Sequence, residues 1–135
     1  MSSIKYKNNS LFVENTSVKR LVSKYKSPFY LYSNSNIIEN YKSFYNNFKK
    51  VTPLICFSVK ANSNVQILRI LKKMGSGADV VSGGELLKTL KSGIKPNKIV
   101  FSGVGKTEEE LRLAIKKKIL LINIESENEA VLINK

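Results

Sequence analysis

Two hydrophobic patterns alternate along residues 53–135. Short apolar runs begin 20 to 24 residues apart, and each is followed by a segment whose apolar residues recur at helical spacing. The predicted strands cover residues 54–60, 78–82, 98–102 and 119–124, and the predicted helices cover residues 65–74, 84–91, 108–117 and 126 onward. Short strands that alternate with single helices predict a parallel sheet with right-handed crossovers, so the fold class is α/β.

The ends of these predicted helices carry their own signals. Gly75 and Gly93 stand just after two of them, where a residue with positive φ commonly ends a helix. Thr107 and Glu110 have the spacing of a capping box at the start of a third. The pair Gly83-Gly84 is expected to let another helix start close against the sheet.

The N-terminal residues 1–27 follow a different pattern and are predicted to form a separate segment, while residues 28–135 form the second domain. Pro28 ends the first predicted helix. The elements predicted before residue 53 are a strand at residues 11–13, a helix at 17–25, an aromatic strand at Phe29–Tyr32, and an amphipathic helix capped by Ser35 and running to about Lys49.

Four strand and helix units are too few to close a (β/α)8 barrel, which takes about 250 residues. The repeat therefore forms either an open, doubly wound sheet or the first half of such a barrel. Along residues 54–60 the large apolar side chains share one face of the strand, whereas Cys56, Ser58 and Lys60 share the other. Small polar groups and a lysine would then face inward at the C-terminal end of the strand, where barrel enzymes place their catalytic groups.

The composition is that of a folded domain, with 135 residues, 42% hydrophobic and 24% charged. No apolar stretch approaches the roughly 20 residues of a membrane span, and the N-terminus lacks the apolar core of a secretory signal, so the cytoplasm is the expected location. The chain has no histidine and a single cysteine, Cys56, which is expected to be a small buried thiol. These counts argue against an internal disulfide, a zinc-finger ligand set and a triad with a histidine base, and no metal site is expected.

The formal net charge of +13 would suit a nucleic-acid partner, because lysine and arginine neutralise phosphates. The distribution of these cations favours solvated surface instead. Their longest run is Lys116–Lys118 at a predicted helix C-terminus, where cations stabilise the helix dipole. The sequence has no recognisable nucleic-acid module and no basic patch with interleaved aromatic residues, so neither nucleic acid nor a membrane is expected as a partner.

Lys60 and Asp79 are the candidate site residues. A lysine at the end of an apolar strand either reaches water or is held in a site, where its amine can react with a carbonyl group. Asp79 follows Gly77 and Ala78 at a strand boundary, where an aspartate is often only a turn or cap residue. Periodicity alone leaves both alternatives open.

The stretch Gly103–Thr107 is similar to the end of a phosphate-binding loop, because it follows a predicted strand and precedes a predicted helix. That motif needs a glycine five residues before Gly105, and Val100 stands there. We therefore expect no nucleotide site at this loop and assign Thr107 to helix capping.

Several motifs together resemble those of the fold-type III pyridoxal-phosphate decarboxylases. CFSVKANSN at residues 56–64 resembles the cofactor-lysine signature of this family. Within the family, GSGADVVSGGEL at residues 75–86 and KIVFSGVGKT at residues 98–107 resemble the diaminopimelate decarboxylases. The pattern is completed by LFVE at 11–14, SPFYLY at 27–32 and NIES at 123–126. The resemblance covers residues 11–135, with the motifs in the family's order.

The resemblance implies an alanine-racemase-like (β/α)8 TIM barrel, of which this chain forms the N-terminal half, preceded by a segment that joins a C-terminal β domain. It implies that Lys60 binds pyridoxal phosphate (PLP) covalently and that Asp79 lies near the cofactor ring. The implied reaction is the decarboxylation of meso-diaminopimelate to L-lysine, the last step of lysine biosynthesis, by a homodimer. The family's phosphate loop, ring-stacking histidine and substrate-binding arginines would lie beyond residue 135, so the chain alone is expected to be inactive.

Two other functions stay open. The first is another fold-type III decarboxylase, acting on arginine or on a substrate of polyamine synthesis. The second is a non-catalytic module that binds PLP or a protein partner. Sequence beyond residue 135 would discriminate among the three functions. A histidine-containing strand, a Gly-rich loop and a Cys-Glu-Ser motif there would identify the decarboxylation of diaminopimelate, whereas a natural stop after residue 135 would favour the non-catalytic module.

Overall fold

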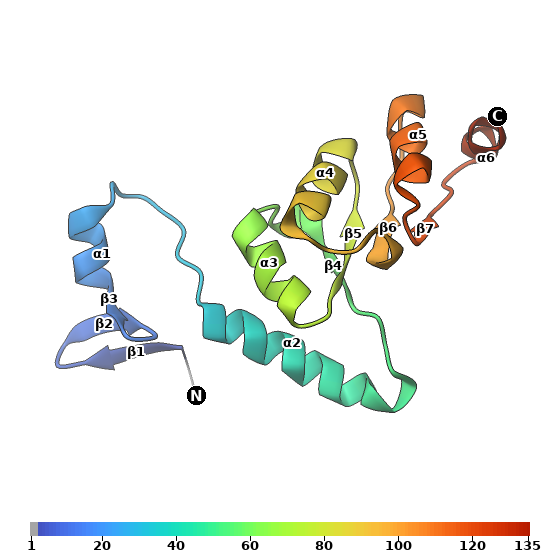
Figure 1. Ribbon diagram of the computed structural model, residues 1–135. Helices are drawn as coiled ribbons and strands as arrows, with labels where there is room; N and C mark the ends of the chain where they lie inside the picture. The colour runs from blue at the N-terminus through green and yellow to red at the C-terminus, as the bar shows by residue number, and fades with distance from the viewer. Residues whose placement is uncertain (1–2) are drawn as a thin grey trace. The chain divides into compact units, whose positions relative to one another are not determined.

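A computed structural model describes residues 3–135 of the chain (Figure 1). It divides into two compact units, Met1–Asn46 and Asn47–Lys135. The domain boundary predicted between residues 27 and 28 refers to the domains of the full-length protein, and it stays a prediction. Within residues 3–135, no helix has the length and apolar character that crossing a membrane requires.

The first unit contains a three-stranded antiparallel sheet followed by a short helix. Its elements are β1 (Ile4–Lys7), β2 (Ser10–Val13), β3 (Thr16–Ser17) and α1 (Val18–Lys24). The predicted strand at residues 11–13 and the predicted helix after Ser17 are confirmed. Strand β1 was not predicted because its Ile4 and Tyr6 lie in an otherwise polar N-terminal segment. A turn with positive φ at Asn8 and Asn9 pairs it with β2, as such hairpin turns commonly do.

The segment after α1 differs from the prediction at two places. Phe29–Tyr32 forms no strand, since it pairs with no other strand in the described part of the chain, and the Tyr30 side chain is 90% exposed. The helix α2 (Asn34–Phe48) is capped by Ser33 rather than Ser35, because Ser33 Oγ accepts the N–H of Asn36 at 3.1 Å. The prediction therefore found the helix and misplaced its cap by two residues.

The second unit has the predicted alternation of strands and helices (Figure 1). Its strands are β4 (Cys56–Ser58), β5 (Gly77–Val80), β6 (Ile99–Phe101) and β7 (Leu121–Ile122), and its α-helices are α3 (Val65–Lys73), α4 (Gly83–Ser92), α5 (Glu108–Lys117) and α6 (Glu127–Asn134). Short 3-10 turns lie at η1 (Lys49–Val51), η2 (Val59–Ala61) and η3 (Pro96–Lys98). The four strands pair in sequence order and all are parallel, as predicted.

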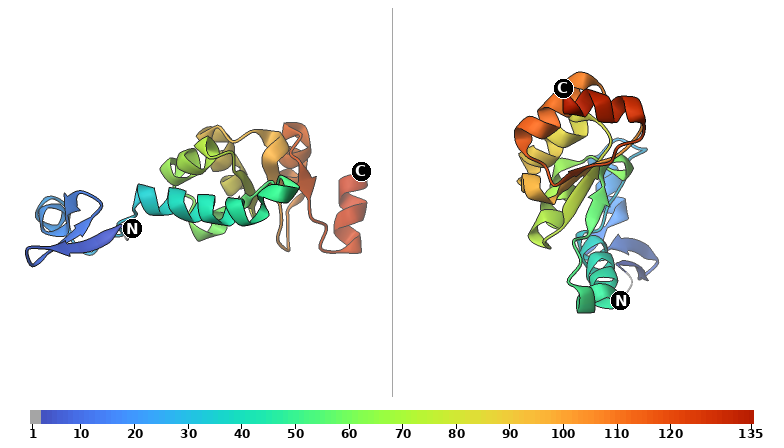
Figure 2. Two further views of the ribbon diagram at one scale, coloured as in Figure 1. Left: turned by 90° about the horizontal axis from the view of Figure 1, so that it is seen from below. Right: turned by 90° about the vertical axis from the view of Figure 1, so that its right-hand side faces the viewer.

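One face of this sheet forms the core of the unit. Phe57, Ala78 and Ile99 lie side by side in the register and face the helices, where Leu68 of α3 and Leu86 of α4 pack against the strands. Figure 2 shows these helices together on one side of the sheet. The opposite face carries the register row Ser58, Asp79, Val100 and Leu121. The face of the first strand that was predicted to carry the large apolar side chains is therefore the face that the helices cover.

The predicted helix signals are largely confirmed. Gly75 and Gly93 take positive φ angles, and Thr107 and Glu110 form a complete capping box at α5. Of the Gly83-Gly84 pair, only Gly83 lies in a close approach, and it faces α5 rather than the sheet. Its N–H donates to Glu110 Oε1 at 2.6 Å, and an added Cβ would lie 3.1 Å from Glu110 Cγ.

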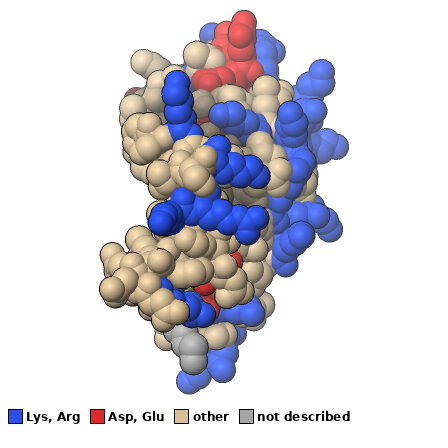
Figure 3. Space-filling view, turned by 90° about the vertical axis from the view of Figure 1, so that its left-hand side faces the viewer, with Lys and Arg blue, Asp and Glu red and all other residues tan. Residues whose placement is uncertain are grey.

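Lysine and arginine side chains extend over much of the face in Figure 3. The run Lys116–Lys118 is exposed and lies at the C-terminal end of α5, as predicted. Cations at this position stabilise the helix dipole, so this run has a structural explanation.

Candidate functional site

Lys60 lies just beyond the C-terminal end of β4. The strand ends at Ser58, and the chain turns through η2, where the N–H of Asn62 donates to the carbonyl of Val59 at 3.0 Å. Val59 is fully buried in the core, whereas Lys60 is exposed. The alternation of residues 54–60 predicted Lys60 as the last residue of the strand. Lys60 lies instead in the turn that follows the strand.

Asp79 lies in β5, in register with Ser58 of β4. It is half-buried, and its carboxylate accepts a hydrogen bond from Ser102 Oγ at 2.5 Å. It is neither a turn residue nor a helix cap. Since β4 and β5 are parallel neighbours, the structure brings Asp79 and the turn with Lys60 to the C-terminal part of the same two strands.

Two polar residues that the sequence prediction missed complete this edge of the sheet. Ser102 follows β6 and Asn123 follows β7, and Asn123 Nδ2 donates to Ser102 Oγ at 2.9 Å. The N–H of Ser102 donates to the carbonyl of Val80, which continues the pairing of β5 and β6. Each residue is the first polar position after an apolar run, and that repetition was the signal available in the sequence.

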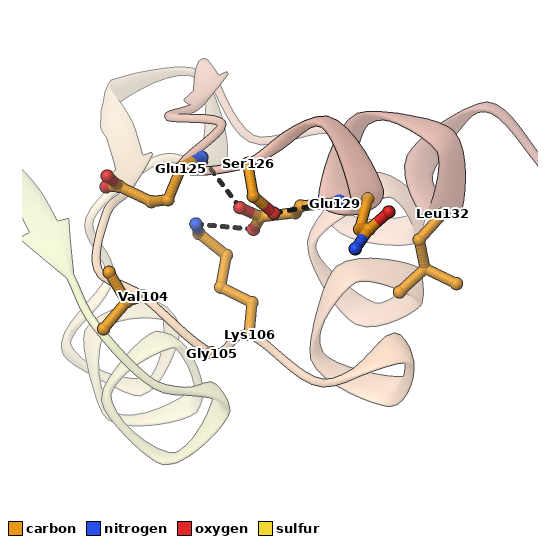
Figure 4. A pocket seen from close by; sticks show the side chains of 8 residues that line it. Val104, Gly105, Lys106, Glu125, Ser126, Glu129 and Leu132 are labelled. Atoms are coloured by element: carbon orange, nitrogen blue, oxygen red, sulfur yellow. Dashed lines mark hydrogen bonds and ion pairs between the residues drawn. The ribbon is translucent and has the colours of Figure 1, made fainter.

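Lys106, the lysine of the apparent phosphate loop, is buried and has protein partners. Its ammonium donates to the carbonyl oxygens of Gly103 at 2.8 Å and Asn123 at 2.7 Å, and to Glu129 Oε1 at 2.6 Å. Only 1% of its side chain is exposed, and that of Glu129 is 8% exposed. Figure 4 shows the Lys106 ammonium directed at the Glu129 carboxylate. An ammonium has three protons to donate, so Lys106 is already engaged and is not available to a nucleotide phosphate.

Cys56, which was predicted to be a small buried thiol, is half-buried. Burial raises the pKa of its thiol, and the negative charge of Asp79 raises it further. The thiolate is the nucleophilic form of cysteine, so these surroundings disfavour the reactive form of Cys56.

The Lys106–Glu129 pair gives the first testable prediction. Burial by itself would raise the pKa of Glu129, but hydrogen bonds from Lys106 and from the N–H of Glu125, together with the charge of Lys106, hold it below its usual value of 4.5. A lowered folded-state pKa stabilises the fold above the unfolded-state pKa, and this stabilisation is lost as the pH falls through the folded-state value.

We therefore expect Glu129→Gln to lower the urea midpoint at neutral pH and to leave a shallower loss of stability below about pH 4.5. The measurement is urea unfolding of the full-length protein at a series of pH values. Glu109→Gln is the matched control, since Glu109 is exposed on α5. Equal acid sensitivity of the Glu129→Gln variant and the unmodified protein would contradict the role of this pair.

Comparisons with known proteins agree on one family. Residues 34–135 match the family model described as the pyridoxal binding domain of pyridoxal-dependent decarboxylases. A curated relative from Aquifex aeolicus, named diaminopimelate decarboxylase, is 42% identical over 131 residues, which make up 97% of this chain and 31% of the relative. A relative of the same name from Helicobacter pylori strain J99 is 50% identical over 108 residues, covering 80% of this chain and 27% of the relative.

A solved structure gives the same result for the fold. The crystal structure of a diaminopimelate decarboxylase from M. jannaschii in complex with L-lysine matches with a TM-score of 0.94 at 35% identity, covering 99% of this chain and 33% of that one. The α/β class and the first half of a TIM barrel are thereby confirmed. The chain spans about a third of the length of the relatives that it matches.

Proposed function

Since the chain belongs to the pyridoxal-dependent decarboxylases, we propose that the full-length protein removes carbon dioxide from meso-diaminopimelate and releases L-lysine. The proposal rests on the position of Lys60 and Asp79 at the same edge of the sheet. It rests also on the relatives of this chain, which bear the name diaminopimelate decarboxylase. The relative from M. jannaschii was crystallised with L-lysine, which would be the product of this reaction.

The residues at this edge fit pyridoxal phosphate. Lys60 offers an exposed primary amine, the group that reacts with the aldehyde of the cofactor. Asp79, Ser102 and Asn123 provide a polar surface on the face of the sheet that the helices leave uncovered. When bound, the cofactor accepts the electron pair that decarboxylation leaves on the substrate.

Each residue has a distinct proposed role. Lys60 would hold the cofactor through its side-chain amine, the group that the amino group of the substrate would replace. Asp79 presents its carboxylate to the cofactor, and the hydrogen bond from Ser102 orients that carboxylate. The β strands supply a rigid base for both residues, which a site needs in order to position reacting groups.

The wider organisation of the protein is also proposed from the family resemblance. Residues 1–27 would join a C-terminal β domain, and residues 28–135 would begin the PLP-binding barrel. The protein would act as a homodimer in the cytoplasm, with an amino acid as its substrate and without nucleic acid.

The substrate is tested directly with purified full-length protein supplied with pyridoxal phosphate. We expect carbon dioxide and L-lysine from meso-diaminopimelate, and neither arginine nor ornithine should be decarboxylated at a comparable rate. Protein without added cofactor is the control. Decarboxylation of arginine or ornithine instead would identify another enzyme of the family, and cofactor binding without turnover of any substrate would identify a non-catalytic module.

A further inference from the structure

A chain of hydrogen bonds runs along the C-terminal edge of the sheet, starting at Asp79. Ser102 Oγ donates its one proton to Asp79, because a carboxylate can only accept. The lone pairs of Ser102 Oγ are then left to accept from Asn123 Nδ2. The direction of each bond is therefore determined, and the orientation of the Ser102 hydroxyl depends on the position of Asn123.

The backbone of Asn123 is held from two sides. Its N–H donates to the carbonyl of Phe101 at 2.9 Å, and its carbonyl accepts from Lys106 Nζ at 2.7 Å. Lys106 in turn bonds to Glu129 on α6, whose second carboxylate oxygen accepts the N–H of Glu125 at 2.9 Å (Figure 4). The ion pair thus connects the loop after β6, the loop after β7 and the start of α6.

The burial of this pair needs an explanation beyond stability. Taking two charges out of water costs about as much as their attraction returns, so an apolar pair of similar volume would often stabilise the fold equally well. An ion pair differs from an apolar pair because its hydrogen bonds are directional. Here Lys106 donates to the backbone carbonyls of Gly103 and Asn123, in the loops that follow β6 and β7. Directional bonds of this kind fix the position of Asn123, which apolar packing would not do.

We propose that Lys106 and Glu129 are positioning residues, which hold Asn123 and Ser102 in place and thereby aim the carboxylate of Asp79 at the cofactor. This inference rests on the proposed function, because it requires Asp79 to face pyridoxal phosphate. It predicts that Lys106 contributes to cofactor binding only through Asp79.

A double-mutant cycle tests this dependence, since residues that act through one another give non-additive effects. The dissociation constant of pyridoxal phosphate is measured by titrating the full-length apoprotein, and the visible circular dichroism of the bound cofactor is recorded. We expect Lys106→Met to weaken binding about tenfold and to change the dichroism band, with no further weakening when Asp79 is already alanine. Melting temperatures should fall by similar amounts in both backgrounds.

Lys98→Met is the matched control, because Lys98 also donates to a backbone carbonyl, that of Gly75 at 2.9 Å, but lies before β6 at the other end of the strands. It should leave the dissociation constant and the dichroism band unchanged. Ser102→Ala is a second variant that removes one hydroxyl without leaving a buried charge, and it should reproduce the Lys106→Met result, again only when Asp79 is present.

The outcomes separate this inference from the proposed function. If Lys106→Met and Ser102→Ala weaken binding equally with and without Asp79, the positioning role is wrong, while the assignment of the enzyme stands. If Asp79→Ala alone leaves cofactor affinity and the dichroism band intact, then the role of Asp79 under the proposed function fails and the inference fails with it.

Discussion

Replacing Lys60 by alanine is expected to abolish covalent cofactor labelling and to lower the decarboxylation rate of the full-length protein by several orders of magnitude. Under the proposed function, the substitution removes the amine that would anchor pyridoxal phosphate and exchange with the substrate. The measurement combines borohydride reduction, which fixes the cofactor to its lysine, with mass spectrometry of the peptide that contains residues 58–64. The rate is followed as carbon dioxide released from meso-diaminopimelate.

Lys88→Ala is the matched control for this experiment. Lys88 is also exposed and lies near the same loop, where its Nζ donates to Ser63 Oγ at 3.0 Å. Labelling and rate should stay close to those of the unmodified protein. Undiminished decarboxylation with the label on a different lysine after Lys60→Ala, or loss of labelling after Lys88→Ala, would show that Lys60 has been assigned the wrong role.

The largest expected effect on stability comes from Gly77→Ala, at the start of β5. A Cβ at this position would lie 2.3 Å from the carbonyl oxygen of Lys98 and 2.8 Å from Cys56 Sγ. The first contact is with backbone, so β5 and the turn before β6 would have to move apart. We expect a destabilisation of about 3 kcal/mol or more, measured by urea unfolding, or a loss of soluble protein.

Gly84→Ala is the control of the same chemical type. Gly84 lies in the first turn of α4, and the nearest atom to an added Cβ there is Ser82 Oγ at 3.9 Å. Since alanine is a better helix former than glycine, this substitution should raise stability by about 0.5 to 1 kcal/mol. Equal unfolding midpoints for the two variants would contradict the close contact at Gly77.

The signals that led to correct predictions are local in the sequence. The capping box of Thr107 and Glu110 spans four residues, and the alternation of Phe57 and Ser58 between the two faces of β4 spans two. The errors arose where a contact with a residue far away in the sequence outweighed the local signal. Ser33 and Ser35 are both suitable caps, but the carboxylate of Glu14 accepts the N–H of Ser35 at 2.8 Å, and Ser33 provides the cap.

Strand lengths were overestimated for a related reason. Apolar runs mark every buried position, including those in the turns next to a strand, whereas a strand requires paired backbone. Val59 is fully buried yet belongs to the turn η2, and Ile119 packs against the core before β7 begins. Hydrophobicity reports burial at these positions, and hydrogen bonding decides the strand ends.

The sequence by itself determined the order of strands and helices, their parallel arrangement and the placement of Lys60 and Asp79 toward one end of the sheet. These features follow from periodicity, helix caps and strand parity, which depend on near neighbours along the chain. Only the tertiary structure decided that Asp79 is held by Ser102, and that Lys106 pairs with Glu129 instead of meeting a phosphate. The partners in each pair are 23 residues apart, and such contacts exist only after consecutive parallel strands have paired and brought these distant segments side by side.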